Sequence, residues 1–302
     1  MKSLKKLNWI LIHGDCRVKD GILRYQPKVI SEGPNAGQDQ ACLIKSNLDF
    51  ENGSVTFRTK IKDPESKVQI GFNHGLGSEI FAGLNNGGAA YGISTFTNGK
   101  WENFATVGSG SSPPIDEDII IRIRVNGSNL QLFVNDVLAV QGSFLVRRSQ
   151  VSFLLIAKQE IEVELISVEK SPSIAFVVMQ YTDEFDALYR EVIAPTCEKF
   201  GFKAVKADDI YNNGLIIEDI AKSIREATIV IADITPDNPN VFYEVGFSHG
   251  IGKPTILLAD RGRAKLPFDV NGFRTIFYDN TIAGKPMVEE RLTQHLRNVI
   301  GN

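Results

Sequence analysis

The sequence predicts a two-domain protein, with an N-terminal antiparallel β-sandwich and a C-terminal α/β domain built on a flavodoxin-like, parallel five-stranded sheet. A chain of 302 residues suits two domains, each large enough to bury a core. Residues 40–170 alternate apolar and polar side chains in short runs separated by turns. Beyond residue 171, apolar runs alternate with helical stripes, which indicates parallel βα units. We therefore place the domains at 1–170 and 171–302.

The N-terminal half shows the period of two that is typical of strands with one buried face. Residues 53–62 form one such run, and residues 118–125 and 130–135 form a pair joined by an Asn-Gly-Ser-Asn turn. Residues 151–157 and 160–170 add two more strands. Because no helical stripe of useful length interrupts these strands, we expect a sandwich or a barrel.

The C-terminal half alternates strands and helices in strict order. The expected strands are 174–179, 202–207, 228–233, 254–259 and 274–279. The expected helices are 183–201, 215–227, 240–252 and 286–301. This order predicts right-handed crossovers and helices on both faces of the sheet. Five strands in about 130 residues suit the strand order 2-1-3-4-5 of doubly wound folds.

The composition argues against several classes of function. The net charge is −3 and no dense basic stripe occurs, so we do not expect nucleic acid as a partner. Cys16, Cys42 and Cys197 form no CxxC pair, and we interpret them as reduced core thiols. The apolar stretch before His13 is too short for a signal peptide, and no span approaches the roughly 20 residues of a membrane helix. We expect a cytoplasmic protein with no membrane partner and no metal.

Ligands of doubly wound sheets bind at the carboxyl ends of the strands, so the residues that follow each strand are candidates for a site. The candidates are Gln180, Tyr181, Asp208, Asp209, Asp233, Asn238 and Asn240, with Arg261 and Arg263 after the fourth strand. The two arginines would meet a phosphate or lie in a solvated loop. Neither GxGxxG nor a Walker A motif occurs, which argues against Rossmann dinucleotide and P-loop chemistry.

The third helix carries a single acid among apolar residues. Asn238 is a good N-cap and Pro239 suits the first helical position, so Glu244 lies about one and a half turns into the helix. Ser248 shares its face at i+4. Aromatic neighbours on either side would raise the pKa of Glu244 and exclude water. Alternatively, Glu244 is a solvated helix residue or an ion-pair partner of Lys253 or Arg225.

A motif around this acid resembles a known family. The pattern AD-x-T-x-x-NPNV-x-YE-x-G-x-x-H-x-x-GKP runs from Ala232 to Pro254. With residues 176–193 and 266–279, it resembles the nucleoside 2-deoxyribosyltransferase-like superfamily, and more closely its bacterial branch that is similar to TIR domains. The resemblance covers residues 173–300. It implies that Glu244 attacks the sugar C1′ and that Asp233 and Asn238 contact the base or the sugar.

The resemblance implies an N-glycosidase or (deoxy)ribosyltransferase-like enzyme that cleaves a nucleoside, a nucleotide or NAD. A carboxylate near C1′ can stabilise or trap an oxocarbenium-like sugar. Further substrate contacts are expected from Gln180, Tyr181, Asp208, Asp209, Asn240 and Ser248, and no cofactor is expected, with NAD a substrate at most. Multidomain relatives imply a bacterial defence effector and a homo-oligomer. The alternatives are a nucleotide sensor without turnover and a TIR-like assembly module.

The N-terminal half has a weaker resemblance to concanavalin A-like or laminin-G-like sandwiches, based on the hairpin at residues 118–140. Such sandwiches imply a glycan ligand, and a binding, sensing or oligomerising role with a glycan or protein partner is expected. Trp101, Phe104 and Tyr91 are candidates for stacking on a sugar, although aromatic residues in a sandwich are more often part of its core.

Overall fold

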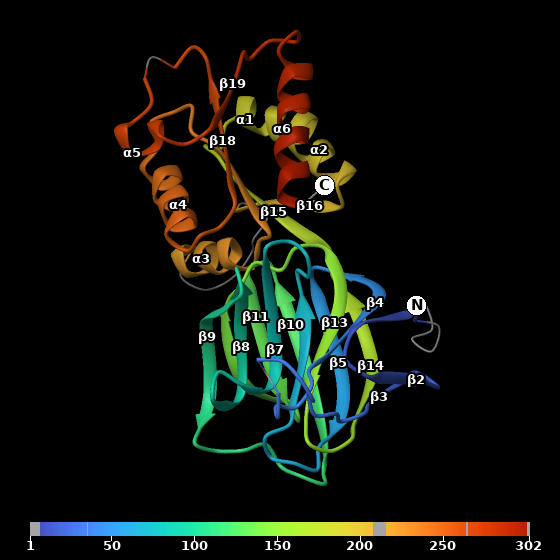
Figure 1. Ribbon diagram of the computed structural model, residues 1–302. Helices are drawn as coiled ribbons and strands as arrows, with labels where there is room; N and C mark the ends of the chain where they lie inside the picture. Colours follow the sequence, from blue (N-terminus) through green and yellow to red (C-terminus); the bar gives the residue numbers. More distant parts are fainter. Residues whose placement is uncertain (1–6, 35, 208–215, 264, 301–302) are drawn as a thin grey trace. The chain divides into compact units, whose positions relative to one another are not determined.

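The computed structural model describes residues 7–34, 36–207, 216–263 and 265–300. The chain divides into two compact units: residues up to 171, apart from 126–128, and residues from 172 onward with that short segment. Figure 1 shows one unit built of strands alone and one in which helices surround a sheet. Within the described residues, no helix combines the length and the apolar character needed to cross a membrane.

The first unit contains two sheets of seven strands each. One has the order β1-β4-β13-β6-β7-β8-β9, and the other has the order β12-β11-β10-β5-β14-β3-β2. The pairings within both are antiparallel, which confirms the expected sandwich. The strands are β1 (Trp9–His13), β2 (Cys16–Lys19), β3 (Ile22–Tyr25), β4 (Cys42–Phe50), β5 (Gly53–Lys60), β6 (Lys67–Phe72), β7 (Ser78–Asn86), β8 (Ala89–Thr97), β9 (Lys100–Ser109), β10 (Asp118–Asn126), β11 (Asn129–Val134), β12 (Val137–Ser143), β13 (Ser149–Ile156) and β14 (Ile161–Lys170).

The core of the sandwich follows from the alternation in its strands. On β10, Ile119, Ile121 and Ile123 are fully buried, as the period of two predicts. The two sheets meet through aromatic contacts, because Phe57 of β5 packs edge-on against Phe153 of β13 with ring centroids 5.0 Å apart. These side chains belong to one continuous apolar cluster.

Tight turns set the strand pairing at the edges of both sheets. Asn98 and Gly99 between β8 and β9 have φ of 51° and 79°, and Asn135 and Asp136 between β11 and β12 have φ of 47° and 65°. Two consecutive residues with positive φ are the signature of a type I′ hairpin, whose twist matches that of the flanking strands. Asn, Asp and Gly are the residues that adopt this conformation at low cost.

The second unit contains five parallel strands in the order β16-β15-β17-β18-β19, which confirms the predicted order 2-1-3-4-5. The strands are β15 (Ser173–Val178), β16 (Phe202–Lys206), β17 (Ile229–Asp233), β18 (Thr255–Asp260) and β19 (Thr275–Tyr278). The helices are α1 (Asp183–Leu188), η2 (Tyr189–Ile193, a π-helix), α2 (Ala194–Lys199), α3 (Ile216–Glu226), α4 (Pro239–Gly250), α5 (Phe268–Asn271) and α6 (Lys285–Ile300).

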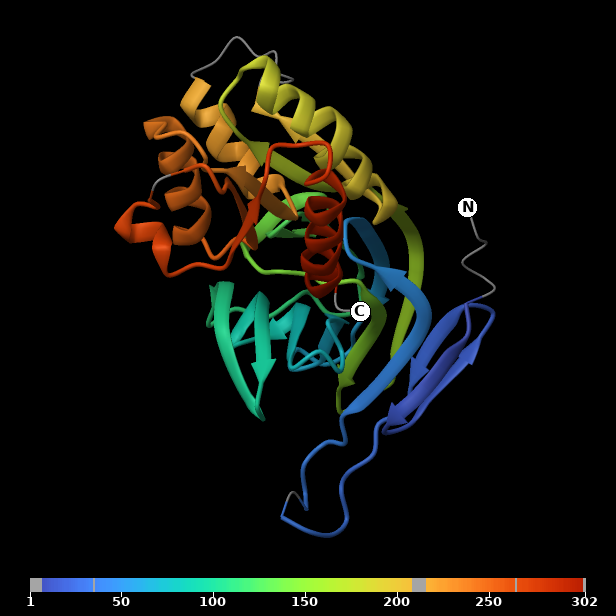
Figure 2. The same ribbon diagram turned by 90° about the horizontal axis from the view of Figure 1, so that it is seen from above.

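Helices cover both faces of this sheet (Figure 1 and Figure 2). One apolar cluster joins strands to α1, α2 and α6 through Phe185, Cys197 and Leu292. The other joins strands to α3 and α4 through Ile224 and Val245. The apolar residues of β15 and β17 contribute to the two clusters in alternation, which explains why β17 is apolar up to its last residue, Asp233.

The first expected helix is one run of three segments rather than a regular α-helix. A π turn at Tyr189–Ile193 separates α1 from α2. Pro195 lies in the first turn of α2 and has no N–H to donate to the carbonyl four residues earlier. A local change of helical register is a common response to such a lost hydrogen bond. The run ends before Gly201, whose φ of 76° suits a helix C-terminus.

Candidate functional site

The start of α4 is built as the sequence predicts. The Asn238 side chain accepts a hydrogen bond from the backbone N–H of Asn240 at 3.0 Å, and Pro239 occupies the first turn. Asn238 therefore caps the helix at the carboxyl end of β17, the edge at which ligands of parallel sheets bind. One acceptor site of its side-chain oxygen is used by the cap, so a second acceptor site and the two N–H donors of the amide are left for a ligand.

Glu244 is partly buried and lacks an ionic partner among the described residues. Burial raises the pKa of its carboxyl to about 7. The alternative ion pair with Lys253 does not form, because the Lys253 ammonium is buried and donates to the backbone carbonyls of Arg225 and Ala227. The sequence-based expectation that apolar surroundings raise the pKa of Glu244 thus agrees with its environment.

Asp233 is fully buried at the end of β17, and neighbouring groups use both of its oxygens. The backbone N–H of Thr235 donates to one oxygen at 2.9 Å, and the hydroxyl of Tyr278 donates to the other at 2.7 Å. Burial raises the pKa of Asp233. Tyr278 was not among the sequence-based candidates, although its place at the end of β19 puts it on the same edge of the sheet. In the sequence, only its place at the end of an expected strand indicates that it belongs to this edge.

Arg263 holds the segment between β17 and α4 in place. Its side chain is 6% exposed, and the guanidinium donates to the backbone carbonyls of Ile234 and Thr235 and to the carboxylate of Asp237. Arg261 lies 3.4 Å from the carboxylate of Asp279. Neither of the two expected alternatives, a phosphate contact or a solvated loop, describes Arg263, because its donors are already satisfied within the protein.

The other sequence-based candidates are divided between the surface and the interior. Ser248 is fully buried, and its hydroxyl donates to the Glu244 carbonyl at 2.8 Å, so its proton is used within the helix. Tyr181 is 45% exposed, Asn240 is exposed and Gln180 is partly buried. The candidates Asp208 and Asp209 lie outside the described residues.

The raised pKa of Glu244 predicts a dependence of stability on pH. In the folded state its pKa of about 7 lies above the ordinary value of 4.5, so the folded state binds this proton more tightly. The resulting contribution to stability is complete below pH 4.5 and is lost as the pH rises through 7. Across this window, we expect the free energy of unfolding of the wild type to fall by about 1–3 kcal/mol more than that of Glu244→Gln.

Denaturant unfolding at intervals of pH measures this difference, with Glu198→Gln as the control because Glu198 is an exposed carboxylate in the same unit. Parallel pH profiles for the wild type and Glu244→Gln would contradict the assignment.

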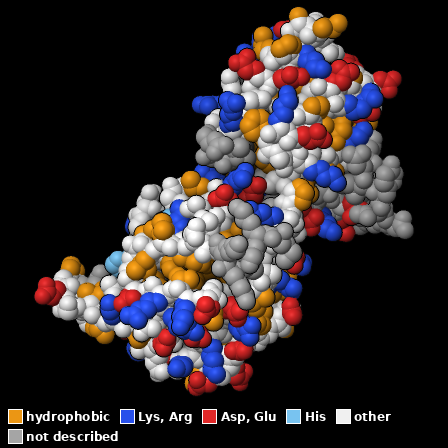
Figure 3. Space-filling model, turned by 90° about the vertical axis from the view of Figure 1, so that its right-hand side faces the viewer, with side chains coloured by type: hydrophobic (Ala, Val, Ile, Leu, Met, Phe, Trp, Pro, Cys, Tyr) orange, Lys and Arg blue, Asp and Glu red, His pale blue; other side chains and the backbone are white. Residues whose placement is uncertain are grey.

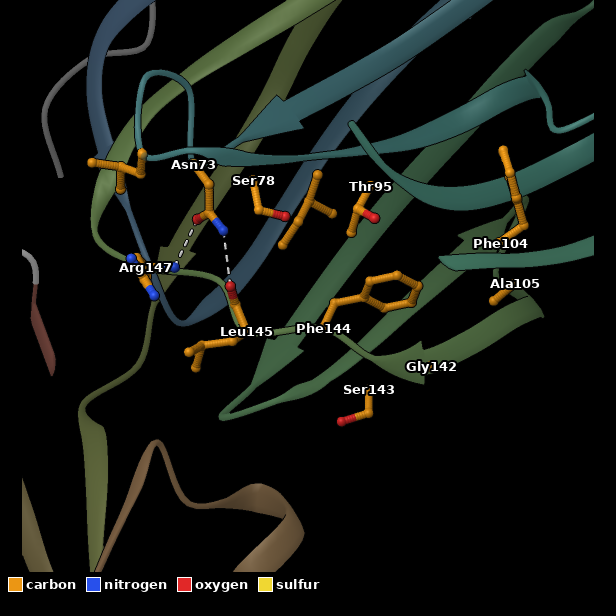
Figure 4. A pocket seen from close by; sticks show the side chains of 12 residues that line it. Asn73, Ser78, Thr95, Phe104, Ala105, Gly142, Ser143, Phe144, Leu145 and Arg147 are labelled. Carbon is orange, nitrogen blue, oxygen red and sulfur yellow. Dashed lines mark hydrogen bonds between the residues drawn. The ribbon is translucent and has the colours of Figure 1, made fainter. Parts of the chain in front are cut away.

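The sandwich contains a cavity of about 470 Å³ between β7, β8, β9 and the segment that joins β12 to β13. Figure 4 shows Phe104 and Ala105 at one end of it and Asn73 and Arg147 at the other. The ring of Phe144 forms part of the wall and lies against Gly142, where an added Cβ would be 2.5 Å from the ring. A cavity of this size, with apolar walls and a few polar groups, suits a small ligand.

The polar groups of the cavity differ in how far they are already paired. The Asn73 amide donates to the Leu145 carbonyl at 2.9 Å and accepts from the Arg147 N–H at 2.8 Å (dashed in Figure 4), so it shapes the loop. The guanidinium of Arg147, in contrast, has no partner among the described residues, and Arg147 is exposed. Ser78 accepts from Thr97 at 3.0 Å. The cavity therefore offers a positively charged donor opposite an aromatic ring.

The three aromatic candidates for stacking on a sugar have different environments. Phe104 is 49% exposed and lines the cavity. Trp101 is 43% exposed but packs against Phe81 and Phe96 with ring centroids 5.3 and 5.0 Å away. Tyr91 packs against the core of the sandwich. Of the three, Phe104 combines an exposed ring with a neighbouring cavity.

Comparisons with known proteins concern the first unit. No family model matches the chain, and no curated protein matches it. Among solved structures, a carbohydrate-binding module from Bacillus subtilis is 12% identical, with a TM-score of 0.39, over 52% of this chain and 92% of that one. A Bacillus licheniformis β-glucanase is 11% identical, with a TM-score of 0.38, over 52% and 88%. A Bacillus subtilis protein with a galectin-like fold is 8% identical, with a TM-score of 0.39, over 52% and 87%.

These comparisons correct the expected function. The similar proteins described above are a glycan-binding module, a glucan-cleaving enzyme and a galectin-like protein, and none acts on a nucleoside or NAD by its description. The expectation of a nucleoside N-glycosidase, with its nucleotide-sensing and TIR-like alternatives, is therefore wrong. Nothing in these comparisons supports the resemblance of residues 173–300 to the nucleoside 2-deoxyribosyltransferase-like superfamily.

Proposed function

We propose that the β-sandwich binds a carbohydrate in the cavity between β7, β8, β9 and the segment from β12 to β13. The observation that supports this most directly is the exposed ring of Phe104 at the rim of a cavity of about 470 Å³, which is also lined by Arg147, whose guanidinium has no partner among the described residues. An aromatic face covers the apolar C–H surface of a sugar ring, and a guanidinium donates to hydroxyl or carboxylate oxygens. A glycan presents both kinds of surface.

The charge in the cavity favours one class of glycan. Arg147 is the charged residue among those described as lining the cavity, and it is a cation. Arginine binds carboxylates through two parallel hydrogen bonds, which is stronger than a single bond to a neutral hydroxyl. A sugar that carries a carboxylate, such as a uronic acid, would therefore be bound more tightly than its neutral counterpart.

The experiment is titration calorimetry of the full chain with soluble neutral and uronic-acid-containing polysaccharides. We expect Phe104→Ala to weaken binding about tenfold, because loss of a stacked aromatic side chain costs about 1–2 kcal/mol. Val107→Ala is the matched control, because Val107 is an exposed apolar residue of the same strand that does not line the cavity. Failure of the wild type to bind any of the glycans, or equal losses in both variants, would overturn the proposal.

The role of the charge has its own test. Arg147 lines the cavity and Arg148, the next residue, does not, although both are exposed. We expect Arg147→Ala to lower the affinity for uronic-acid polysaccharides by about tenfold and to abolish their advantage over neutral ones. Arg148→Ala should leave both affinities unchanged. If the two variants behave alike, general attraction between opposite charges rather than a fitted contact explains the binding.

A second candidate function is supported by Glu244. We propose that it transfers a proton to or from a small polar molecule held at the carboxyl ends of the parallel strands, near Tyr181 and Asn240. A carboxyl whose pKa lies near 7 is partly protonated at neutral pH and is suited to general acid–base work. A thermal-shift screen of small polar molecules tests this. The proposal requires one that stabilises the wild type more than Glu244→Gln, and Glu198→Gln should respond as the wild type does.

A further inference from the structure

Two of the three cysteines lie together in the sandwich, although 26 positions separate them in the sequence. Cys16 begins β2 of one sheet and Cys42 begins β4 of the other. Gly14, two residues before Cys16, lies against Cys42, since a Cβ added to it would be 2.9 Å from the Cβ of Cys42, and Cys16 packs against the apolar cluster that contains Cys42. Neither is part of a disulfide, and the third cysteine, Cys197, is buried in the other unit.

The backbone around the pair explains why the two thiols meet. His13 of β1 pairs with Leu43 of β4, so the chain reaches the start of β4 just before it turns towards Cys16. Gly14 makes this turn with φ of 86°, and an added Cβ would lie 2.6 Å from the Cα of Cys42. The contact of this turn with Cys42 is therefore backbone against backbone. It brings the turn before Cys16 up to Cys42.

The strand beside Cys16 is anchored to the segment before Cys42. Cys16 pairs with Tyr25 of β3, whose ring is fully buried. The Tyr25 hydroxyl donates to the carbonyl of Gln40 at 2.8 Å, two residues before Cys42. The two cysteines are thus held together on both sides, by the turn at Gly14 and by this hydrogen bond.

The two thiols differ in exposure and in acidity. Cys16 is partly exposed, whereas Cys42 is fully buried. The hydrogen bond from Cys42 lowers the pKa of Cys16, and the same bond, with burial, raises the pKa of Cys42. A thiolate is the form that reacts with oxidants, and an accessible thiolate beside a second thiol is the arrangement found in redox-sensitive cysteine pairs.

We propose that Cys16 and Cys42 form a reversible disulfide that joins the two sheets of the sandwich. The oxidant is a peroxide. The Cys16 thiolate attacks hydrogen peroxide, takes one oxygen to become a sulfenic acid, and releases hydroxide. The Cys42 thiol then attacks the Cys16 sulfur, the S–S bond forms, and the sulfenic oxygen leaves as water with the thiol proton. A dithiol reductant reverses the step.

The test is peroxide treatment of the full chain, followed by intact-mass measurement and peptide mapping without reduction. We expect a loss of about 2 Da, a linked peptide that contains Cys16 and Cys42, and recovery of the original mass with dithiothreitol. The oxidised protein should also unfold at a temperature at least about 5 °C higher, because the cross-link restricts the unfolded chain. Cys197→Ser should behave as the wild type does.

Variants separate the two chemical steps. In Cys42→Ala, the sulfenic acid on Cys16 should have no second thiol to react with. Dimedone should therefore label Cys16, and the mass loss of about 2 Da should no longer be observed. Cys16→Ala should show neither product. A wild type that is labelled by dimedone at Cys16 as strongly as Cys42→Ala, or a linked peptide that contains Cys197, would overturn the proposal. Peptide mapping of the wild type shows whether Cys16 and Cys42 become linked, even if a variant fails to fold.

Discussion

Gly53→Ala is expected to destabilise the sandwich by at least about 3 kcal/mol. Gly53 begins β5, a strand paired on both sides with β10 and β14. Its φ is 115°, which side chains rarely adopt, and an added Cβ would lie 2.0 Å from the carbonyl oxygen of Glu169. Because this oxygen belongs to the backbone of the paired strand, it cannot move aside without breaking the ladder between β5 and β14.

The control for this prediction is Gly99→Ala, in the hairpin between β8 and β9. Gly99 also has a positive φ, of 79°, but no atom lies within 4 Å of an added Cβ. Gly99→Ala should therefore lower the free energy of unfolding only by the cost of placing a side chain in the left-handed conformation, about 1 kcal/mol. Urea unfolding followed by circular dichroism measures both. Equal losses would show that the backbone conformation, and not the contact with Glu169, decides the cost at Gly53.

Tyr278→Phe is expected to destabilise the α/β unit by about 2–3 kcal/mol. The Tyr278 hydroxyl donates to the Asp233 carboxyl at 2.7 Å, in a place where Asp233 is fully buried. Removal of the hydroxyl leaves one oxygen of a buried carboxyl without a donor, which is costlier than loss of the hydrogen bond alone. The Thr235 N–H continues to serve the other oxygen.

The matched control is Tyr243→Phe, because Tyr243 is 54% exposed and its hydroxyl is open to water. It should change the free energy of unfolding by less than about 0.5 kcal/mol. A double-mutant cycle with Asp233→Asn then measures the coupling between Tyr278 and Asp233. We expect the two single losses not to add, because both remove the same hydrogen bond. Additive losses would mean that the pair does not act as a unit.

The two proposed sites depend on different physical properties of their residues. The cavity of the sandwich relies on an exposed aromatic ring and on a guanidinium that no other described residue engages, and these would bind a ligand without a chemical step. Glu244 relies on its pKa, which burial brings close to neutral pH. The two proposals can therefore be tested independently, because the residues changed to test one site are not part of the other site.

Periodicity predicted most of the fold because it reports which face of each element is buried. The alternation along β10 and the stripes along the helices could be assigned residue by residue. Strict βα alternation predicted the parallel sheet, and its order, β16-β15-β17-β18-β19, is the one that doubly wound folds of this size favour. The π turn at Tyr189–Ile193 could not be predicted, because it depends on how the helix absorbs the missing N–H of Pro195. The N-cap at Asn238 was predictable, because its signal is local.

The functional residues were predicted less well, because a site joins residues that are far apart in the sequence. Glu244 was found through its unusual place in an apolar helix. Tyr278 and Asp233 are 45 positions apart, and only the parallel sheet puts the ends of β17 and β19 on one edge. The cavity beside Phe104 also could not be predicted, since it forms where the segment after β12 crosses β7, β8 and β9.

The sequence by itself determined the two kinds of fold and the start of α4, because each depends on local patterns of apolar side chains and caps. Only the tertiary structure decided which polar groups are free to act. It enclosed Asp233 and Arg263 in internal hydrogen bonds, left Glu244 and Arg147 without partners among the described residues, and brought Cys16 to Cys42. The physical reason is that hydrogen bonding and burial of a side chain depend on neighbours that the fold supplies, not on its neighbours in the chain.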